Sequence, residues 1–163
     1  MCGCERNLPL TPWDLMARLL NFLVAEDNEN DRFFLESAFV EAGVQAVLTF
    51  VCDGEDVIEY LGGGVRFSDR CQFPYPDLLL LDMRMRRCDG FDVLKWMRGR
   101  AATRWMPVIV LSSSSLEKDV KLALDLGANS YLQKPVSSAK LVEMARAIGA
   151  FWAGHNVFPG CAR

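Results

Sequence analysis

Histidine is almost missing from this sequence, and the cysteines do not compensate for it. The 163 residues include one histidine, His155, and six cysteines without a paired C-x-x-C spacing. A structural zinc site needs about four ligands, mostly cysteine and histidine, so the segment Cys2-Gly3-Cys4 is a poor candidate for a metal site. We interpret the cysteines as free thiols in a reducing compartment.

A strong net charge and long apolar runs are missing as well. The net charge is -3, so no global basic field argues for binding to nucleic acid. No apolar run approaches the roughly 20 residues of a membrane span, and residues 1–20 lack the pattern of a secretory signal. We therefore expect a cytoplasmic protein that binds neither nucleic acid nor membranes. At 51% hydrophobic residues, the chain can form one domain with a substantial core.

The most apolar stretch is the run of four leucines from Leu78 to Leu81, which ends in Asp82. Such a run cannot alternate between core and water, so both of its faces must be covered. It fits a central strand of a parallel sheet, although periodicity alone also allows a buried helix.

Apolar strand patterns and helical patterns alternate five times along the chain. This order predicts a doubly wound, five-stranded parallel sheet with helices on both faces. We assign it to residues 19–152, with an N-terminal extension of unknown role at 1–18 and a C-terminal tail at 153–163. The expected strands cover residues 19–25, 46–51, 78–82, 107–111 and 130–133.

Two local patterns lie between these elements. The irregular stretch 62–77 is long for a compact domain, which favours a functional or mobile loop. Ser114 and Glu117 have the spacing of a capping box, which predicts that Ser114 caps the following helix.

Polar side chains stand at the carboxyl ends of four of the five predicted strands, and these ends meet at one edge of such a sheet. Three carboxylates that close together repel one another, and a hard divalent cation such as Mg²⁺ relieves the repulsion. Separately, each residue has an ordinary explanation as a helix cap, turn residue or solvated lysine. Their coincidence favours a common site made of Glu26, Asp27, Asp82, Ser112 and Lys134.

This set of residues suits phosphoryl chemistry. With a metal present, Asp82 can act as a nucleophile toward a phosphoryl group and form an acyl phosphate. Lys134 would neutralise charge on the transferred oxygens, and the hydroxyl of Ser112 would hydrogen-bond to one of them. The backbone carbonyl of Arg84 is placed to add a metal ligand.

The chain from residue 19 to residue 152 resembles the receiver domain of two-component response regulators. The resemblance implies a CheY-like fold with strand order 2-1-3-4-5. It is carried by Glu26-Asp27, the Asp82-x-x-Met85 motif running to Gly90, Ser112 after an apolar strand, and Lys134-Pro135.

The resemblance also implies a role for each matching residue. Glu26 and Asp27 would bind Mg²⁺, and Asp82 would accept the phosphoryl group. Ser112 would be the switch hydroxyl and Lys134 the lysine that contacts the phosphate. Tyr131 falls on the position of the switch aromatic, whose ring turns inward as the hydroxyl moves toward the phosphate.

Three further features narrow the match within the receiver family. They are the long stretch before the third strand, the segment 125–131, and the Phe151-Trp152 pair. They are most similar to stand-alone regulators that partner phytochrome-type histidine kinases, which implies such a kinase as partner. Because residues 153–163 are too few for an output domain, we expect the signal to leave by protein contact. The face formed by the fourth helix, fifth strand and fifth helix is the expected reporter, and that face or the tail could form a homodimer.

One position departs from the family pattern. Arg86 stands where proline usually follows the methionine of the Asp82 motif, and proline would fix φ there. With Arg84 and Arg87, it makes the rim of the site basic. These arginines could slow phosphate loss, meet an acidic partner or form ordinary solvated surface.

Two other functions are compatible with the same residues. An aspartyl-phosphate hydrolase would share nucleophile, metal and lysine, but Arg84 stands where such enzymes carry a second aspartate as general acid. A receiver-shaped docking module that is never phosphorylated would not need the complete set of acidic, hydroxyl and lysine residues.

Overall fold

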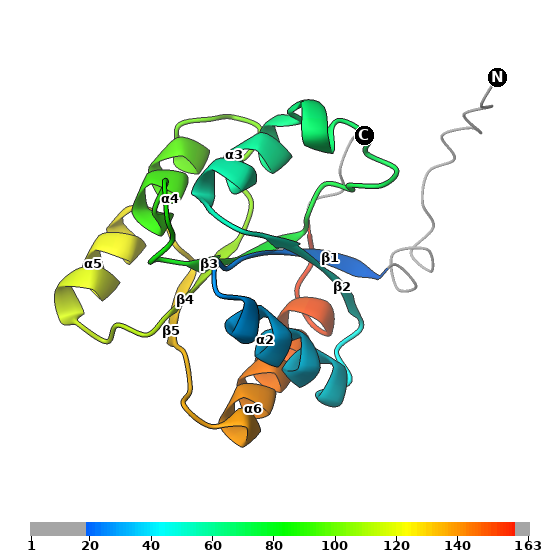
Figure 1. Ribbon diagram of the computed structural model, residues 1–163, viewed down its shortest axis with the longest axis vertical. Coiled ribbons are helices and arrows are strands. Elements are labelled where there is room, and N and C mark those ends of the chain that lie inside the picture. The colour runs from blue at the N-terminus through cyan, green and yellow to red at the C-terminus, as the bar shows by residue number, and fades with distance from the viewer. Residues whose placement is uncertain (1–18, 159–163) are drawn as a thin grey trace.

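The computed structural model describes residues 19–158, and the N-terminal extension, the Cys2-Gly3-Cys4 segment and the end of the tail lie outside this range. Five parallel strands form one sheet in the order β2-β1-β3-β4-β5 (Figure 1). The predicted fold class and strand order are therefore confirmed. The strands are β1 (Leu20–Ala25), β2 (Ala46–Val51), β3 (Leu78–Asp82), β4 (Val108–Ser112) and β5 (Ser130–Gln133).

Helices cover both faces of this sheet. Helices α2 (Glu29–Glu41) and α6 (Ser138–Ile148) pack together on one face, and α6 continues into the π-helical turn η2 (Gly149–Ala153). The other face carries α3 (Gly54–Gly62), α4 (Gly90–Arg98) and α5 (Glu117–Asp125) (Figure 1). No helix among residues 19–158 is long and apolar enough to cross a membrane.

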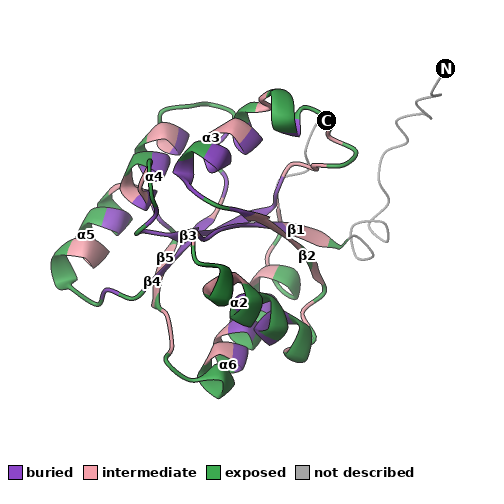
Figure 2. Cartoon of the chain, viewed as in Figure 1, coloured by how far each residue is buried: buried purple, intermediate pink, exposed green. Residues whose placement is uncertain are grey.

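The leucine run of β3 lies at the centre of the sheet and explains why both faces need helices. Leu79 and Leu81 belong to the core under α3 and α4, whereas Leu78 and Leu80 belong to the core under α2 and α6. All four residues are 0% exposed, and Figure 2 colours β3 as buried. Neighbouring residues of a strand point to opposite faces, so the run supplies both cores at once. The sequence interpretation as a central strand is confirmed.

Side chains cap most of the helices at their N-termini, as helix-initiating sequences lead one to expect. The carboxylate of Asp53 accepts from the N–H of Asp56 at the start of α3, and Ser137 does the same for Lys140 at the start of α6.

The predicted capping box of α5 is wrong. The helix begins later than predicted, so Leu116 is its N-cap residue and no side chain caps it. The hydroxyl of Ser114 instead accepts from the N–H of Leu116 and donates to the carboxylate of Asp119.

The irregular stretch 62–77 packs against α3 and contains the short 3-10 turn η1 (Val65–Phe67). Tyr60, Phe67 and Phe73 form an aromatic cluster with ring centroids 4.9 to 6.1 Å apart. The hydroxyl of Tyr60 also donates to the carbonyl of Pro74 at 2.9 Å. The described cysteines, Cys52, Cys71 and Cys88, are free thiols, as predicted.

Candidate functional site

The three predicted carboxylates meet at the carboxyl edge of the sheet. Parallel register pairs Ala25 with Leu81, so the residues that follow β1 lie beside the end of β3. One carboxylate oxygen from each of Glu26, Asp27 and Asp82 lies within 4.8 Å of the other two. Oxygen donors at this spacing suit a hard divalent cation such as Mg²⁺.

Lys134 joins this cluster from the end of β5. Its ammonium donates to the carboxylates of Glu26, Asp31 and Asp82, with distances of 3.1 Å to both aspartates. The Lys134 side chain is 13% exposed and those of Glu26 and Asp82 are 2% and 9% exposed. The ammonium is therefore a largely buried counter-ion, not the solvated lysine of the ordinary explanation.

Burial and neighbouring charges both shift the pKa values of Lys134 and Glu26. Burial of Lys134 opposes its charge, but the hydrogen bond to Glu26 and the charges of Asp82 and Glu26 outweigh it and raise the pKa of Lys134. Burial raises the pKa of Glu26, and the hydrogen bond from Lys134 offsets part of the rise. In the folded protein Lys134 therefore stays charged and binds the two buried acids.

Ser112 lies at the end of β4 and is 0% exposed. Its hydroxyl accepts from the N–H of Ser114 at 3.1 Å, and its carbonyl accepts from the N–H of Lys134 at 2.9 Å. Tyr131 is half-buried on β5, and its hydroxyl donates to the carbonyl of Ser114 at 3.0 Å. The two predicted switch residues thus contact the same residue, Ser114.

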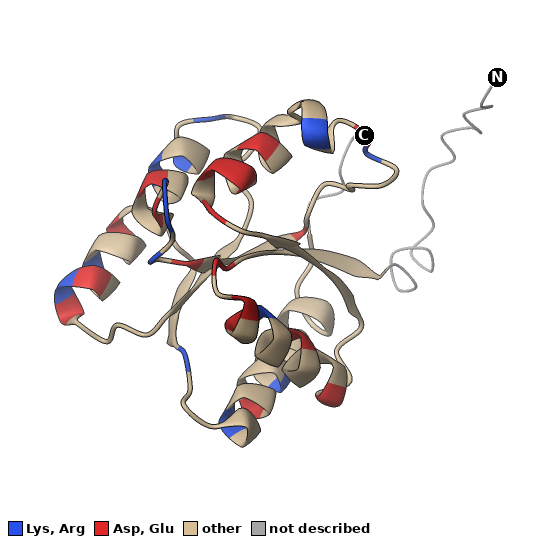
Figure 3. Cartoon of the chain, in the orientation of Figure 1, with Lys and Arg blue, Asp and Glu red and all other residues tan. Residues whose placement is uncertain are grey.

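The arginines after Asp82 lie in different environments. The backbone N–H of Arg84 donates to a carboxylate oxygen of Asp82 at 3.2 Å, and the Arg84 side chain is exposed. Figure 3 shows the basic positions of the β3–α4 loop beside the acidic strand ends. Arg86 pairs with Asp27 at 3.4 Å, and Arg87 pairs with Asp53. Both side chains remain exposed, so these ion pairs lie at the solvated surface of the site.

Sequence reasoning missed two acidic residues of this region. Asp31 lies on the first turn of α2, and its carboxylate accepts a hydrogen bond from Lys134. Asp53 is 3% exposed and forms an ion pair with Arg87. Its place two residues after the end of β2 is the signal that could have drawn attention to it.

Gly90 allows α4 to pack closely against the backbone of Asp82. A β-carbon added to Gly90 would lie 2.7 Å from the carbonyl oxygen of Asp82 and from the sulfur of Met83. The first turn of α4 can approach the end of β3 this closely only because position 90 has no side chain.

The fold and the site define an open α/β module with an acidic, lysine-containing pocket at its carboxyl edge. Residues 22–146 match the family model of the response regulator receiver domain. The chain therefore belongs to the receiver family, whose members are phosphoacceptor modules of two-component signalling.

Three solved structures illustrate the relationship. The response regulator RPA3017 in red light signalling of R. palustris is 40% identical, with a TM-score of 0.83, covering 86% of this chain and 99% of that one. The phosphorylated cyanobacterial phytochrome response regulator RcpA is 27% identical, with a TM-score of 0.80 and coverage of 87% and 99%. The Mn²⁺-bound form of Rcp1, a regulator of Synechocystis, is 26% identical, with a TM-score of 0.77 and coverage of 86% and 99%. The chain is thus similar to phytochrome-associated regulators.

Proposed function

We propose that this protein is a response regulator that accepts a phosphoryl group on Asp82 from a histidine kinase and signals by protein contact. The observation that carries this proposal is the bridge from Lys134 to Glu26 and Asp82 inside the acidic cluster. A lysine held by two buried acids next to a third carboxylate is suited to a site that receives a dianionic group.

The residues present fit a divalent cation. Glu26, Asp27 and Asp82 each offer a carboxylate oxygen within 4.8 Å of the others, and the backbone carbonyl of Arg84 is our candidate for a further ligand. When bound, Mg²⁺ would offset the negative charge of the carboxylates and of the incoming phosphoryl group. Rcp1, a relative, has been solved with Mn²⁺ bound.

The transfer itself would use Asp82 as nucleophile. A carboxylate oxygen of Asp82 forms a bond to phosphorus while the bond from phosphorus to the histidine nitrogen of the donor breaks, and the electron pair of that bond stays on the imidazole. The ammonium of Lys134, now 3.1 Å from Asp82, would contact the new phosphoryl oxygens.

The switch would run through Ser114. Movement of the Ser112 hydroxyl toward a phosphoryl oxygen requires it to give up the N–H of Ser114. Tyr131 donates to the carbonyl of the same residue, so a shift of Ser114 also reaches the Tyr131 ring. We propose that phosphorylation biases these two arrangements and that the α5–β5–α6 face reports the result.

An apolar hollow beside the site supports the docking of the kinase domain that carries the phosphohistidine. It has a volume of about 330 Å³ and includes Phe34, Leu141 and Val136, with Lys134 also in its wall. Val136 and Phe34 are exposed. Lys134 lines this hollow and also contacts Asp82, so a donor bound in the hollow would lie beside the proposed phosphoacceptor. A Val136→Asp variant should accept phosphate more slowly from the kinase but normally from acetyl phosphate, and equal slowing with both donors would contradict this docking site.

The similarity to phytochrome-associated regulators supports a phytochrome-type kinase as partner. A cytoplasmic location and homodimerisation through the α5–β5–α6 face or the C-terminal tail remain parts of this proposal.

The phosphoacceptor role can be tested by intact mass after incubation with acetyl phosphate, with and without Mg²⁺. We expect a gain of one phosphoryl group that requires Mg²⁺ and is absent from an Asp82→Asn variant. Asp92→Asn is the matched control, because Asp92 lies on the exposed surface of α4, where it forms an exposed ion pair with Lys95. A folded protein that gains no mass would favour the docking module instead.

A further inference from the structure

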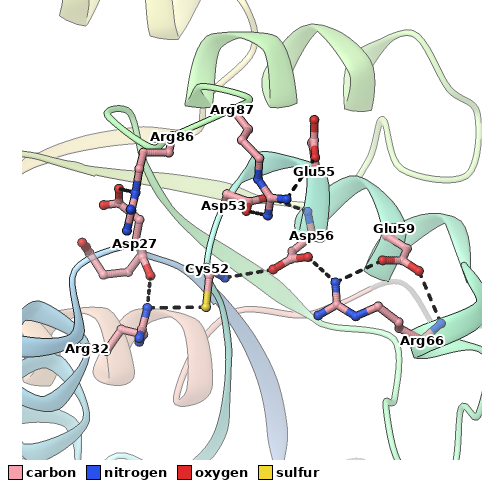
Figure 4. A network of polar contacts seen from close by, with 11 residues as sticks. Asp27, Arg32, Cys52, Asp53, Glu55, Asp56, Glu59, Arg66, Arg86 and Arg87 are labelled. Carbon is pink, nitrogen blue, oxygen red and sulfur yellow. Dashed lines mark hydrogen bonds and ion pairs between the residues drawn. The ribbon is translucent and has the colours of Figure 1, made fainter.

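The loop that follows the acceptor strand, residues 83–89, is anchored by its methionines and presents its arginines outward. Met83 and Met85 are 4% and 8% exposed and belong to the core under α3 and α4. Arg86 and Arg87 are exposed and extend to different sides of the site (Figure 4).

Arg87 holds the loop against the start of α3. It is the one non-glycine residue with positive φ, 67°, in the described range 19–158. Its guanidinium pairs with Asp53 and with Glu55, and the carbonyl of the next residue, Cys88, accepts from the N–H of Gly54 at 3.3 Å. The contacts of Arg87 thus lie at the end of β2 and in α3, away from the three candidate metal ligands.

Arg86 extends instead to the acidic cluster. Its Nε lies 3.4 Å from Oδ2 of Asp27, one of the three candidate metal ligands (Figure 4). Lys134 meanwhile contacts Glu26 and Asp82. Every carboxylate of the cluster therefore has a side-chain cation as its partner, with the lysine holding two of them and Arg86 the third.

The two cations differ in how firmly they are held. The Lys134 side chain is 13% exposed, whereas that of Arg86 is 83% exposed. An exposed ion pair is weak and easily exchanged. A divalent cation that takes the Asp27 oxygen would therefore displace Arg86 first.

We propose that Arg86 is a resident counter-ion that competes with the divalent cation for Asp27 and so sets the metal affinity of the site. The inference rests on the proposed metal site. It gives Arg86, at the usual proline position, a definite role. In the metal-free protein Arg86 relieves the repulsion among the carboxylates, and metal binding has to release it.

The test is calorimetric titration of the full-length protein with MgCl₂, which measures affinity directly and does not depend on phosphorylation. Arg86→Gln removes the competing charge and should bind Mg²⁺ about two- to fivefold more tightly, the range expected for loss of one exposed ion pair. Arg86→Lys keeps a cation at the position and should stay close to the wild-type affinity.

Arg87→Gln is the matched control, because it removes the same charge from the same loop but from a side chain that faces Asp53 and Glu55. Its affinity should change by less than about twofold. The gain in Mg²⁺ affinity of Arg86→Gln over the wild type should also shrink in about 1 M KCl, where the screening length falls to about 3 Å. Thermal unfolding verifies that each variant is folded.

The outcomes separate the two proposals. If Arg86→Gln binds Mg²⁺ no more tightly than the wild type, or if Arg87→Gln gains as much, Arg86 does not compete for Asp27 while the metal site stands. If the folded wild-type protein binds no Mg²⁺ at all, the metal site and the competition are both wrong.

Discussion

Replacement of Lys134 by methionine tests the energetics of the acidic cluster. Methionine has nearly the same length but no charge, so the change removes the ammonium that contacts Glu26, Asp31 and Asp82. The side chain of Glu26, which is 2% exposed, would then face Asp82 without a cation between them. In the absence of metal we expect the folded state to be strongly destabilised.

The magnitude follows from the burial of each partner. Removal of one member of a buried ion pair typically costs 3–5 kcal/mol, because a charge stays buried without compensation. The contact with Asp31, whose side chain is 40% exposed, adds little. Because Lys134 keeps 13% exposure and water can reach the vacated space, we expect a loss of about 3 kcal/mol in the free energy of unfolding.

Urea denaturation in EDTA at pH 7 measures this loss, and its pH dependence identifies the cause. Above its ordinary pKa of 4.5, Glu26 is ionised in the unfolded chain. Burial raises its pKa in the folded state, and loss of Lys134 removes the contact that offsets the rise. The deficit should therefore be largest near neutral pH and shrink as the pH falls toward and below 4.5, where both states are protonated. Added Mg²⁺ should also reduce it.

Lys121→Met is the matched control, since Lys121 forms an exposed pair with Glu117 on α5. Its free energy of unfolding should change by less than about 0.5 kcal/mol. If Lys134→Met loses no more free energy of unfolding than the control, or if its loss does not depend on pH, Lys134 is not the buried counter-ion of the site.

Three further predictions address other contacts. Gly90→Ala should lower both stability and phosphorylation, by equilibrium unfolding and intact mass, because the new methyl group would lie 2.7 Å from the Asp82 carbonyl oxygen; wild-type behaviour would show that α4 can move away freely. Tyr131→Phe removes the hydrogen bond to Ser114 and should cost about 1 kcal/mol in urea denaturation, whereas a larger loss would mean that the ring itself repacks. Cys88 should react with iodoacetamide more slowly than the two described exposed cysteines, because burial raises its pKa; peptide mass mapping checks the order, and equal rates would contradict it.

The arrangement of the sheet could be predicted because its determinants are local and repetitive. The leucine run of β3 requires cover on both faces, and the capping side chains and glycines between apolar segments place the helices. Parallel strands then bring their carboxyl ends to one edge. That rule alone was enough to predict that Glu26, Asp27 and Asp82 come together, as their spacing of 4.8 Å or less confirms.

The partners of the charged side chains could not be predicted in the same way. The contact between Asp31 and Lys134 joins residues 103 positions apart, and that between Arg87 and Asp53 joins residues 34 positions apart. Which long side chain reaches which carboxylate depends on the path of each loop in three dimensions. The capping box predicted for α5 failed because the Ser114 hydroxyl binds other groups. It accepts from the N–H of Leu116 and donates to the carboxylate of Asp119.

The central claim is that Asp82 carries the phosphoryl group, and locating that group on the chain tests it most directly. The protein would be treated with acetyl phosphate and Mg²⁺ and then with borohydride, which reduces an aspartyl phosphate to homoserine. Peptide mass mapping then identifies the modified residue. We predict homoserine at position 82 and at no other aspartate. Homoserine at another acidic residue, or none in protein that has gained phosphoryl mass, would contradict the assignment.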